Sequence, residues 1–289
     1  MRARPQIALL EGGRLHLQDG PIDLVIGASG AAPAVRCAYR AAAERMETIL
    51  DALCAELPLL RSPVEPGLCP MHGTVARRMH CAVAPYAAAH FITPMAAVAG
   101  AVADEVLGAM LGVAALDRAY VNNGGDIALH LGPGVAFTIG MVDDPERPGL
   151  FGNVRIAAGD GAGGVATSGW RGRSFSLGIA DAVTVLARTA AEADAAATIV
   201  ANAVDLPGHP AVLRVPARDL QPDSDLGERS VTRAVGRLDR HEIDIALAAG
   251  MVCAERLVAG GLILGAALHL QGVTETAGIV PRLTLPVAA

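Results

Sequence analysis

An acid and a hydroxyl stand four residues apart in an alanine-rich segment of the chain. Asp194 and Thr198 are separated only by alanines, and a spacing of four puts both side chains on one face of a helix. Carboxylate and hydroxyl oxygens are ligands that a hard cation such as Mg²⁺ prefers. The pair therefore predicts a magnesium site. The alternative is a threonine whose hydroxyl bonds to its own helix backbone.

A second segment combines amides, glycines and an acid between two apolar runs. It reads Asn122-Asn123-Gly124-Gly125-Asp126. Asparagine and glycine tolerate positive φ, and paired glycines let another group approach the backbone closely. The segment predicts either an ordinary hairpin turn or a turn beneath a ligand.

A third segment, Gly164–Gly178, is a glycine-rich loop that leaves a predicted strand. Hydroxyls, free amides and two guanidiniums are the groups that hold a phosphate. The only tryptophan of the chain, Trp170, lies in its middle. The segment predicts either an anion-binding loop or a solvated loop tip. The candidate ligand-binding residues are Ser168, Gly169, Arg171, Arg173 and Ser174.

Cysteines and histidines between residues 69 and 90 have spacings that zinc sites use. Two of them, Cys69 and His72, lie in a proline-rich loop, whereas His80 and Cys81 are adjacent on a predicted helix and point about 100° apart. We therefore expect buried thiols and surface histidines rather than a zinc site.

Composition excludes several classes of function. The chain has 289 residues, a net charge of −6, and only arginine among its 23 basic residues. Nucleic-acid binding needs clustered cations, so an acidic chain does not favour it. The absence of lysine excludes Schiff-base chemistry and a P-loop. The sequence also lacks the G-x-S-x-G and H-E-x-x-H motifs of serine hydrolases and zinc proteases.

The apolar content, 52% of the residues, raises the question of a membrane. The longest apolar stretches, Phe91–Ala103 and Leu257–Leu268, fall short of the ~20 residues that span a bilayer. The apolar run near the first residue is too short for a signal peptide. Five cysteines without a C-x-x-C pair suit reduced thiols. We expect a cytoplasmic protein without a membrane partner.

The pattern of elements predicts an α+β fold, with helices packed on mixed or antiparallel sheets, in a single domain over residues 1–289. Thr93 and Pro94 are a good N-cap and first helical residue, and Thr189 to Glu192 form a capping box. The expected helices are Ala34–Leu60, Thr74–Ala84, Met95–Val113, about 190–204 and His241–Val258. The expected strands are Ile7–Leu10, Arg14–Leu17, Ile22–Ile26, several between Ala119 and Arg188, and Gly260–Leu270.

Taken in order, five segments resemble motifs of the ApbE superfamily, whose founding activity is the transfer of FMN from FAD to a protein. In that superfamily they correspond to a Gly-x3-Asp helix, a VNxGGD loop under the flavin, an SG strand end, a SVTV strand and an AD-x3-T helix that binds Mg²⁺. The resemblance implies an ApbE-like, T-fold-like architecture, with its motif-bearing core at about residues 90–205. The segments are Ala97–Leu107, Ala119–Leu129, Gly164–Gly169, Asp181–Ala187 and Ala193–Thr198.

Two motifs of the superfamily transferases are replaced. Ala99 stands where they carry a lysine, and WRGRSFSLGIA, residues 170–180, stands where they carry His-x-x-Asp-Pro-x-Thr-Gly. The missing histidine is linked to catalysis in the transferases. The chain thus looks closer to a branch of the superfamily that lacks this motif, and the resemblance supplies no settled activity for that branch.

Three functions follow as hypotheses. The first is an enzyme that binds a flavin-like or other fused-ring anionic ligand, such as FAD, together with Mg²⁺. The second is an FMN transferase with a remodelled base, Asp126 or Asp181. The third is a non-catalytic flavin or cofactor binder. In each, the ligand contacts are expected from Thr93, Asn122, Asn123, Gly124 and Gly125 together with the glycine-rich loop. The alanine-rich helices also suggest a homodimer.

Overall fold

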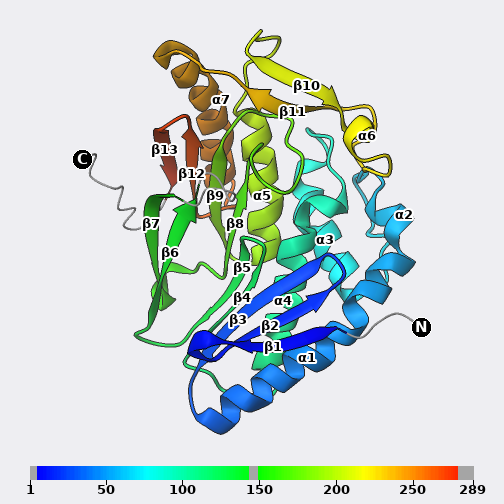
Figure 1. Ribbon diagram of the computed structural model, residues 1–289, viewed down its shortest axis with the longest axis vertical. Helices are drawn as coiled ribbons and strands as arrows, with labels where there is room; N and C mark the ends of the chain where they lie inside the picture. The colour runs from blue at the N-terminus through cyan, green and yellow to red at the C-terminus, as the bar shows by residue number, and fades with distance from the viewer. Residues whose placement is uncertain (1–4, 143–148, 279–289) are drawn as a thin grey trace. The chain divides into compact units, whose positions relative to one another are not determined.

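The computed structural model describes residues 5–142 and 149–278 (Figure 1). Contacts between Cα atoms divide the chain into two compact units whose segments alternate along the sequence. Unit 1 consists of Met1–Ala136, Ala157–Ala166 and Ala187–Ala195. Unit 2 consists of Phe137–Ile156, Thr167–Leu186 and Ala196–Ala289. The predicted α+β class is confirmed, because helices pack on sheets whose described strand pairs are antiparallel.

The strands of unit 1 are neighbours in the order β1-β2-β3-β4-β5-β8, and their described pairs are antiparallel. The register of β2 and β3 places Leu17 opposite Leu24, and both side chains are fully buried. Alternate residues of these strands therefore face the core. The strands are β1 Gln6–Leu10, β2 Arg14–Asp19, β3 Ile22–Ser29, β4 Arg118–Asn123, β5 Asp126–Leu131 and β8 Gly164–Ser168, whose last two residues belong to unit 2.

Helices cover one face of this sheet, where Figure 1 shows α1 and α4 behind the strands. Met46 and Ile49 of α1, Met79 of α3 and Met110 of α4 complete the core. The helices are α1 Ala32–Ala55, α2 Leu57–Leu60, α3 Thr74–Val83, α4 Val98–Leu111 and α5 Ala190–Ala203, which continues into unit 2. Short 3-10 helices span Glu11–Gly13, Ala84–Tyr86, Pro94–Ala97 and Ala158–Asp160.

Unit 2 contains strands β9, β12 and β13 as sheet neighbours, and two separate two-stranded sheets, β6-β7 and β10-β11. Helix α7 packs on β12 and β13. Its Leu247 and the strand residue Leu268 are buried. The elements are β6 Ala136–Val142, β7 Leu150–Ala157, β9 Ala182–Ala187, β10 Val212–Pro216, α6 Ala217–Leu220, β11 Ser230–Val235, α7 Arg240–Ala259, β12 Gly265–Leu270 and β13 Val273–Gly278.

Several local predictions need correction. The expected buried thiols are not found, because Cys69 is half-buried and Cys81 is exposed. The expected helix over 34–60 is broken at Glu56, because Pro58 has no amide hydrogen for a continuous helix. Thr93 occupies an N-cap position without a side-chain cap, and the chain first forms a 3-10 turn before α4. His80 is only 5% exposed, so it is not a surface histidine, and burial lowers its pKa.

One stretch, Pro94–Leu111, is long and apolar enough by composition to cross a membrane. Half of it is buried inside the protein, and α4 contacts α1, α3, β4 and β5. A core helix passes the same test of length and hydropathy, so this stretch is weak evidence for a membrane span.

Candidate functional site

The Asn122–Asp126 segment forms the turn between β4 and β5. Asn123 and Asp126 are paired across the hairpin, and Gly124 and Gly125 have φ of 67° and 114°, which glycine adopts without a steric cost. The amide of Gly125 donates to Asn122 Oδ1 over 2.8 Å. The segment is therefore a hairpin turn, and its role in ligand binding stays a prediction.

This turn is tied to the beginning of α4. Asn123 is 7% exposed, and its Nδ2 donates to the carbonyl oxygen of Ala99 over 3.1 Å. Buried amide groups need such partners, because an unpaired one costs about 1–3 kcal/mol. Two segments of the superfamily pattern are thus held together in unit 1 by a direct hydrogen bond.

Asp194 joins the same place from α5. Its Oδ2 accepts the amide of Gly100 over 3.0 Å, and Gly100 is the third residue of α4. The first amides of a helix have no partner within the helix and attract an anion. Asp194 therefore serves as the carboxylate cap of α4.

The converse contact is made by Asp104 of α4. Its two carboxylate oxygens accept the amides of Ala190 and Ala191, each over 3.0 Å, and these residues begin α5. Thr189 adds the predicted cap, since its Oγ1 accepts the amide of Glu192. Each of the two helices thus begins on a carboxylate that the other helix supplies.

Gly100 makes this contact sterically feasible. A Cβ at this position would lie 2.2 Å from the carbonyl oxygen of Ala190, well inside van der Waals contact. The Gly-x3-Asp spacing therefore has a physical meaning in unit 1. Gly100 admits the beginning of α5, and Asp104, one turn later, caps it. Neither residue was among the candidate site residues, although their spacing was visible in the sequence.

The electrostatics of Asp194 are unusual. Burial raises the pKa of its carboxyl well above the usual range, and the negative charge of Asp126 raises it further, while the amides of Gly100 and Ala99 oppose the shift. Two acids thus interact beside the beginning of α4. Thr198 lies four residues further along α5, in the part of that helix that belongs to unit 2.

Asp194 is the only acid of the predicted metal pair, so a metal ion there would need further ligands from neighbouring residues. Within residues 5–142 and 149–278, no three His, Cys, Asp or Glu side chains gather in a metal-binding arrangement. The potential donors beside the beginning of α4 are all oxygen atoms, from Asp194, Asp126 and the Ala99 carbonyl. Oxygen donors fit Mg²⁺ and do not fit zinc in a structural site.

In unit 2, Asp181 holds the glycine-rich loop. Its Oδ1 accepts Trp170 Nε1 over 3.0 Å and Arg171 Nε over 2.8 Å. Its Oδ2 accepts the amide of Gln271 over 2.6 Å. Asp181 is 5% exposed, and both of its oxygens already accept hydrogen bonds. Its predicted role as a base stays a prediction.

The rest of the loop separates into an inner and an outer part. Gly169 is buried, and a Cβ there would lie 2.4 Å from the carbonyl oxygen of Asp181. Ser168, the last residue of β8, is half-buried. Arg173 and Ser174 are exposed. The guanidinium of Arg173 is therefore accessible from solvent, which is consistent with an anion-binding loop and with a solvated loop tip.

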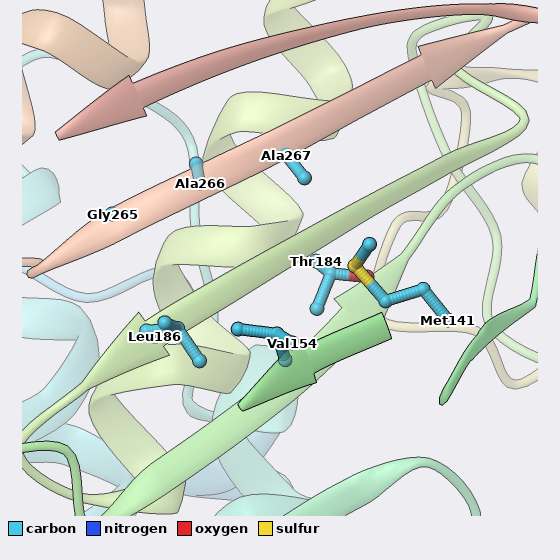
Figure 2. A pocket seen from close by; sticks show the side chains of 7 residues that line it. All are labelled: Met141, Val154, Thr184, Leu186, Gly265, Ala266 and Ala267. Atoms are coloured by element: carbon cyan, nitrogen blue, oxygen red, sulfur yellow. The ribbon is translucent and has the colours of Figure 1, made fainter. Parts of the chain in front are cut away.

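A pocket of unit 2 does not fit the predicted ligand (Figure 2). Thr184 is the one polar side chain among its lining residues, and its hydroxyl lies 2.9 Å from that of Thr167. A site without a charged group offers nothing to an anion. The lining residues are Met141, Val154, Thr184, Leu186, Gly265, Ala266 and Ala267.

Comparison with models of known protein families shows to which family this chain belongs. A family model described as "AbpE bacteria" matches residues 7–276. The chain belongs to this family. The resemblance to ApbE-like proteins that the motifs indicated is thereby confirmed.

Relatives of this AbpE family member include UPF0280 proteins of methanogens. One from Methanopyrus kandleri is 39% identical over 129 residues, which are 44% of this chain and 48% of that protein. One from Methanocella arvoryzae is 36% identical over 161 residues, 55% of this chain and 63% of that protein. The matches thus span between about half and just under two thirds of the length of these relatives.

Solved structures of flavin transferases are more distant. The apo flavinyl transferase ApbE of Pseudomonas stutzeri aligns with a TM-score of 0.44 and 13% identity, over 95% of either chain. The flavin transferase ApbE of Vibrio cholerae aligns with a TM-score of 0.36 and 12% identity, over 95% of this chain and 97% of that one.

Proposed function

We propose that this protein is an ApbE-like enzyme that binds a flavin-like or other fused-ring anionic ligand together with Mg²⁺. The supporting observation is the convergence in unit 1 of the Asn122–Asp126 turn, the beginning of α4 and Asp194. Paired glycines in the turn give a flat ring close access to the backbone. In unit 2, Arg171, Arg173 and Ser174 of the glycine-rich loop are by themselves candidates for holding an anionic group.

Mg²⁺ fits the chemistry of Asp194. A carboxylate that is destabilised by burial and by a second acid gains from a cation, and its neighbours offer oxygen donors only. Asp194 and Thr198 would hold the ion, as their spacing along α5 suggests. When bound, Mg²⁺ polarises a phosphoryl oxygen of the ligand. The Asn122–Asp126 turn and Thr93 would orient the ring.

Two other functions remain as alternatives with their own observations. FMN transfer needs a base, and Asp126 is the better candidate because both oxygens of Asp181 are already hydrogen-bonded. Incubation with FAD, Mg²⁺ and an acceptor that carries the target threonine tests transfer, and an acceptor without the mass of FMN excludes it. A non-catalytic binder is favoured by the replacement of the histidine motif by residues 170–180.

The first experiment is to denature the purified protein and identify the released ligand by mass spectrometry and by its visible spectrum, with and without added Mg²⁺. A released flavin, absorbing near ~450 nm when oxidised, supports the proposal. A protein that arrives empty and fails to take up FAD in the presence of Mg²⁺ contradicts the flavin form of the proposal and redirects the search to other anionic rings.

Asp194→Asn provides the sharpest mutational test of the metal. We expect Mg²⁺-dependent uptake of FAD to fall by at least about tenfold, because the loss of even an outer partner of a metal costs that much. The asparagine retains an oxygen that accepts the Gly100 amide. Asp244→Asn is the control, because Asp244 is an exposed acid paired with Arg240 on α7. Uptake that depends on Mg²⁺ equally in both variants rules out Asp194 as a ligand.

The same variant should not be less stable. The pKa of Asp194 is raised in the folded protein, so the folded state binds more protons than the unfolded one, and the free energy of unfolding falls as pH rises from about 3.8 towards the raised pKa. Asparagine carries no charge and lacks this decline. We expect urea unfolding of Asp194→Asn at pH 7 to give a midpoint equal to or above that of the wild type.

A further inference from the structure

A single carboxylate organises two loops of unit 2. Asp181 accepts hydrogen bonds from the indole of Trp170, from Arg171 Nε and from the backbone amide of Gln271. Gln271 lies in the β12–β13 turn and has a φ of 43°, a left-handed conformation that is rare outside glycine. Asp181 therefore links the glycine-rich loop to a hairpin that is remote in sequence.

The link fixes the plane of the Arg171 guanidinium. Its central carbon lies 4.8 Å from the centroid of the Trp170 ring, within the range of a cation–π contact. Asp181 binds Nε from one side, and the side chain of Arg171 is 36% exposed. A long arginine side chain loses much rotamer freedom when it binds an anion, and here that freedom is already restricted.

Arg171 is not alone at the tip of the loop. Arg173 and Ser174 follow within three residues, and both are exposed. Guanidinium groups and a hydroxyl are donors that phosphate and carboxylate groups accept from. Because Asp181 already neutralises Arg171, the positive charge in excess at this tip belongs to Arg173.

We propose that Asp181 is a positioning residue for an oxyanion site made of Arg171, Arg173 and Ser174, which binds a phosphate or carboxylate group. Asp181 and Trp170 hold Arg171 in its binding orientation before the anion arrives. Preorganisation of this kind raises affinity because the ordering cost is met on folding. The inference rests on the proposed ligand-binding function only for the anionic character of the ligand.

Two effects of Asp181 have opposite signs, and this makes the inference testable. Its negative charge repels an anion, so its removal by Asp181→Asn should strengthen binding if charge alone matters. Its hydrogen bonds order Arg171, so the same change should weaken binding if positioning matters. We expect about a tenfold weakening.

Trp170 is the only tryptophan of the chain, so its fluorescence reports on this loop alone. The wild type is titrated with inorganic phosphate, inorganic pyrophosphate and succinate, without flavin or Mg²⁺. We expect a saturable change in emission, and the anion that produces it distinguishes a phosphate from a carboxylate site. Arg173→Gln should weaken the response at least tenfold.

The control is Asp244→Asn, which removes the same charge and a surface Arg–Asp pair without touching the loop. Its emission and affinity should match the wild type, whereas Asp181→Asn should shift Trp170 emission even without an anion. If Asp181→Asn does not fold, Trp170→Phe keeps a ring beneath Arg171 and removes the indole donor. Calorimetry then replaces fluorescence, with the same expected weakening.

Two results overturn the inference. One is an affinity of Asp181→Asn, or of Trp170→Phe, equal to or above that of the wild type. The other is a wild type that gives neither a saturable emission change nor heat with any of the three anions. Oxyanion binding that persists in a protein unable to bind flavin overturns only the flavin proposal, and flavin binding without oxyanion binding overturns only this inference.

Discussion

Gly100→Ala is expected to lower the free energy of unfolding by about 3 kcal/mol, at the upper end of what overpacking costs. The new methyl group would lie 2.2 Å from the carbonyl oxygen and 2.4 Å from the carbonyl carbon of Ala190. These are backbone atoms at the beginning of α5 and cannot turn aside as a flexible side chain can. Relief requires α4 and α5 to separate, which stretches the hydrogen bonds of Asp104 and Asp194.

The matched control is Gly108→Ala in the same helix. No atom lies within 4 Å of a Cβ at Gly108, and alanine favours a helix over glycine by about 1 kcal/mol. Gly108→Ala should therefore be neutral or stabilising. Urea unfolding followed by circular dichroism measures both variants. Equal effects of the two substitutions would show that helix propensity, not the contact with α5, decides the outcome.

Glu105→Gln is the second change with a large expected effect. Glu105, 14% exposed, binds Arg45 over 2.9 Å and Arg78 over 3.1 Å, and it accepts the hydroxyl of Thr74. Glutamine would remove the charge of Glu105 from beside two partly buried guanidiniums, of which Arg78 would keep only the more distant charge of Asp104. Removing one partner of a buried ion pair costs about 3–5 kcal/mol. Because the arginines are partly solvated, we expect about 2–3 kcal/mol.

The pH dependence of this loss is defined by the pKa of Glu105. Burial raises that pKa, but the hydrogen bonds from Arg78, Arg45 and Thr74 lower it by more, so the net shift is downward. A lowered pKa contributes stability that is present above the usual value near 4.5 and is lost as pH falls through the folded value. The wild type and Glu105→Gln should therefore converge in stability in acid.

A surface glutamate provides the control for this prediction. Glu44 forms an i,i+4 pair with Arg40 on α1, and both side chains are more than 70% exposed. Exposed pairs contribute about 0–1 kcal/mol, so Glu44→Gln should leave both the unfolding free energy at pH 7 and its acid dependence unchanged. A Glu105→Gln variant with the same small effect would mean that solvent, not protein, satisfies the two arginines.

Local signals predicted much of the fold. The capping box at Thr189 predicted the beginning of α5, and the hydroxyl of Thr189 accepts the amide of Glu192. The strands of the first hairpins followed from their alternating patterns, and the helix at Thr74 began where expected. Such features depend on neighbours within four residues, which a sequence displays directly.

Failures of prediction concern features that local patterns do not determine. The β10–β11 pair lay in a segment for which we made no prediction, and it carries a register shift between Leu213 and Arg214. The predicted strand from Gly260 begins only at Gly265, because α7 ends in a turn in which Gly261 has a φ of 67°.

In the candidate site, too, some features could be predicted from local patterns and others could not. The spacing of the Asn122–Asp126 turn and of Asp194 pointed to residues that do meet at the beginning of α4. The sequence contained no sign that Asp104 would cap a helix 86 residues away. Nor did it indicate that Asp181 would bind the Gln271 amide. Such partners depend on chain topology, which residue types alone do not encode.

The reciprocal caps of α4 and α5 also constrain how the chain acquires its structure during synthesis. Residues 1–136 supply α4, but the amides that Asp104 binds and the carboxylate of Asp194 lie in Ala187–Ala195. The ribosome delivers that segment only after two stretches of unit 2 have emerged. Until then the apolar helix α4 and its Asp104 lack these partners, and exposed apolar surface of this kind makes folding intermediates prone to aggregation.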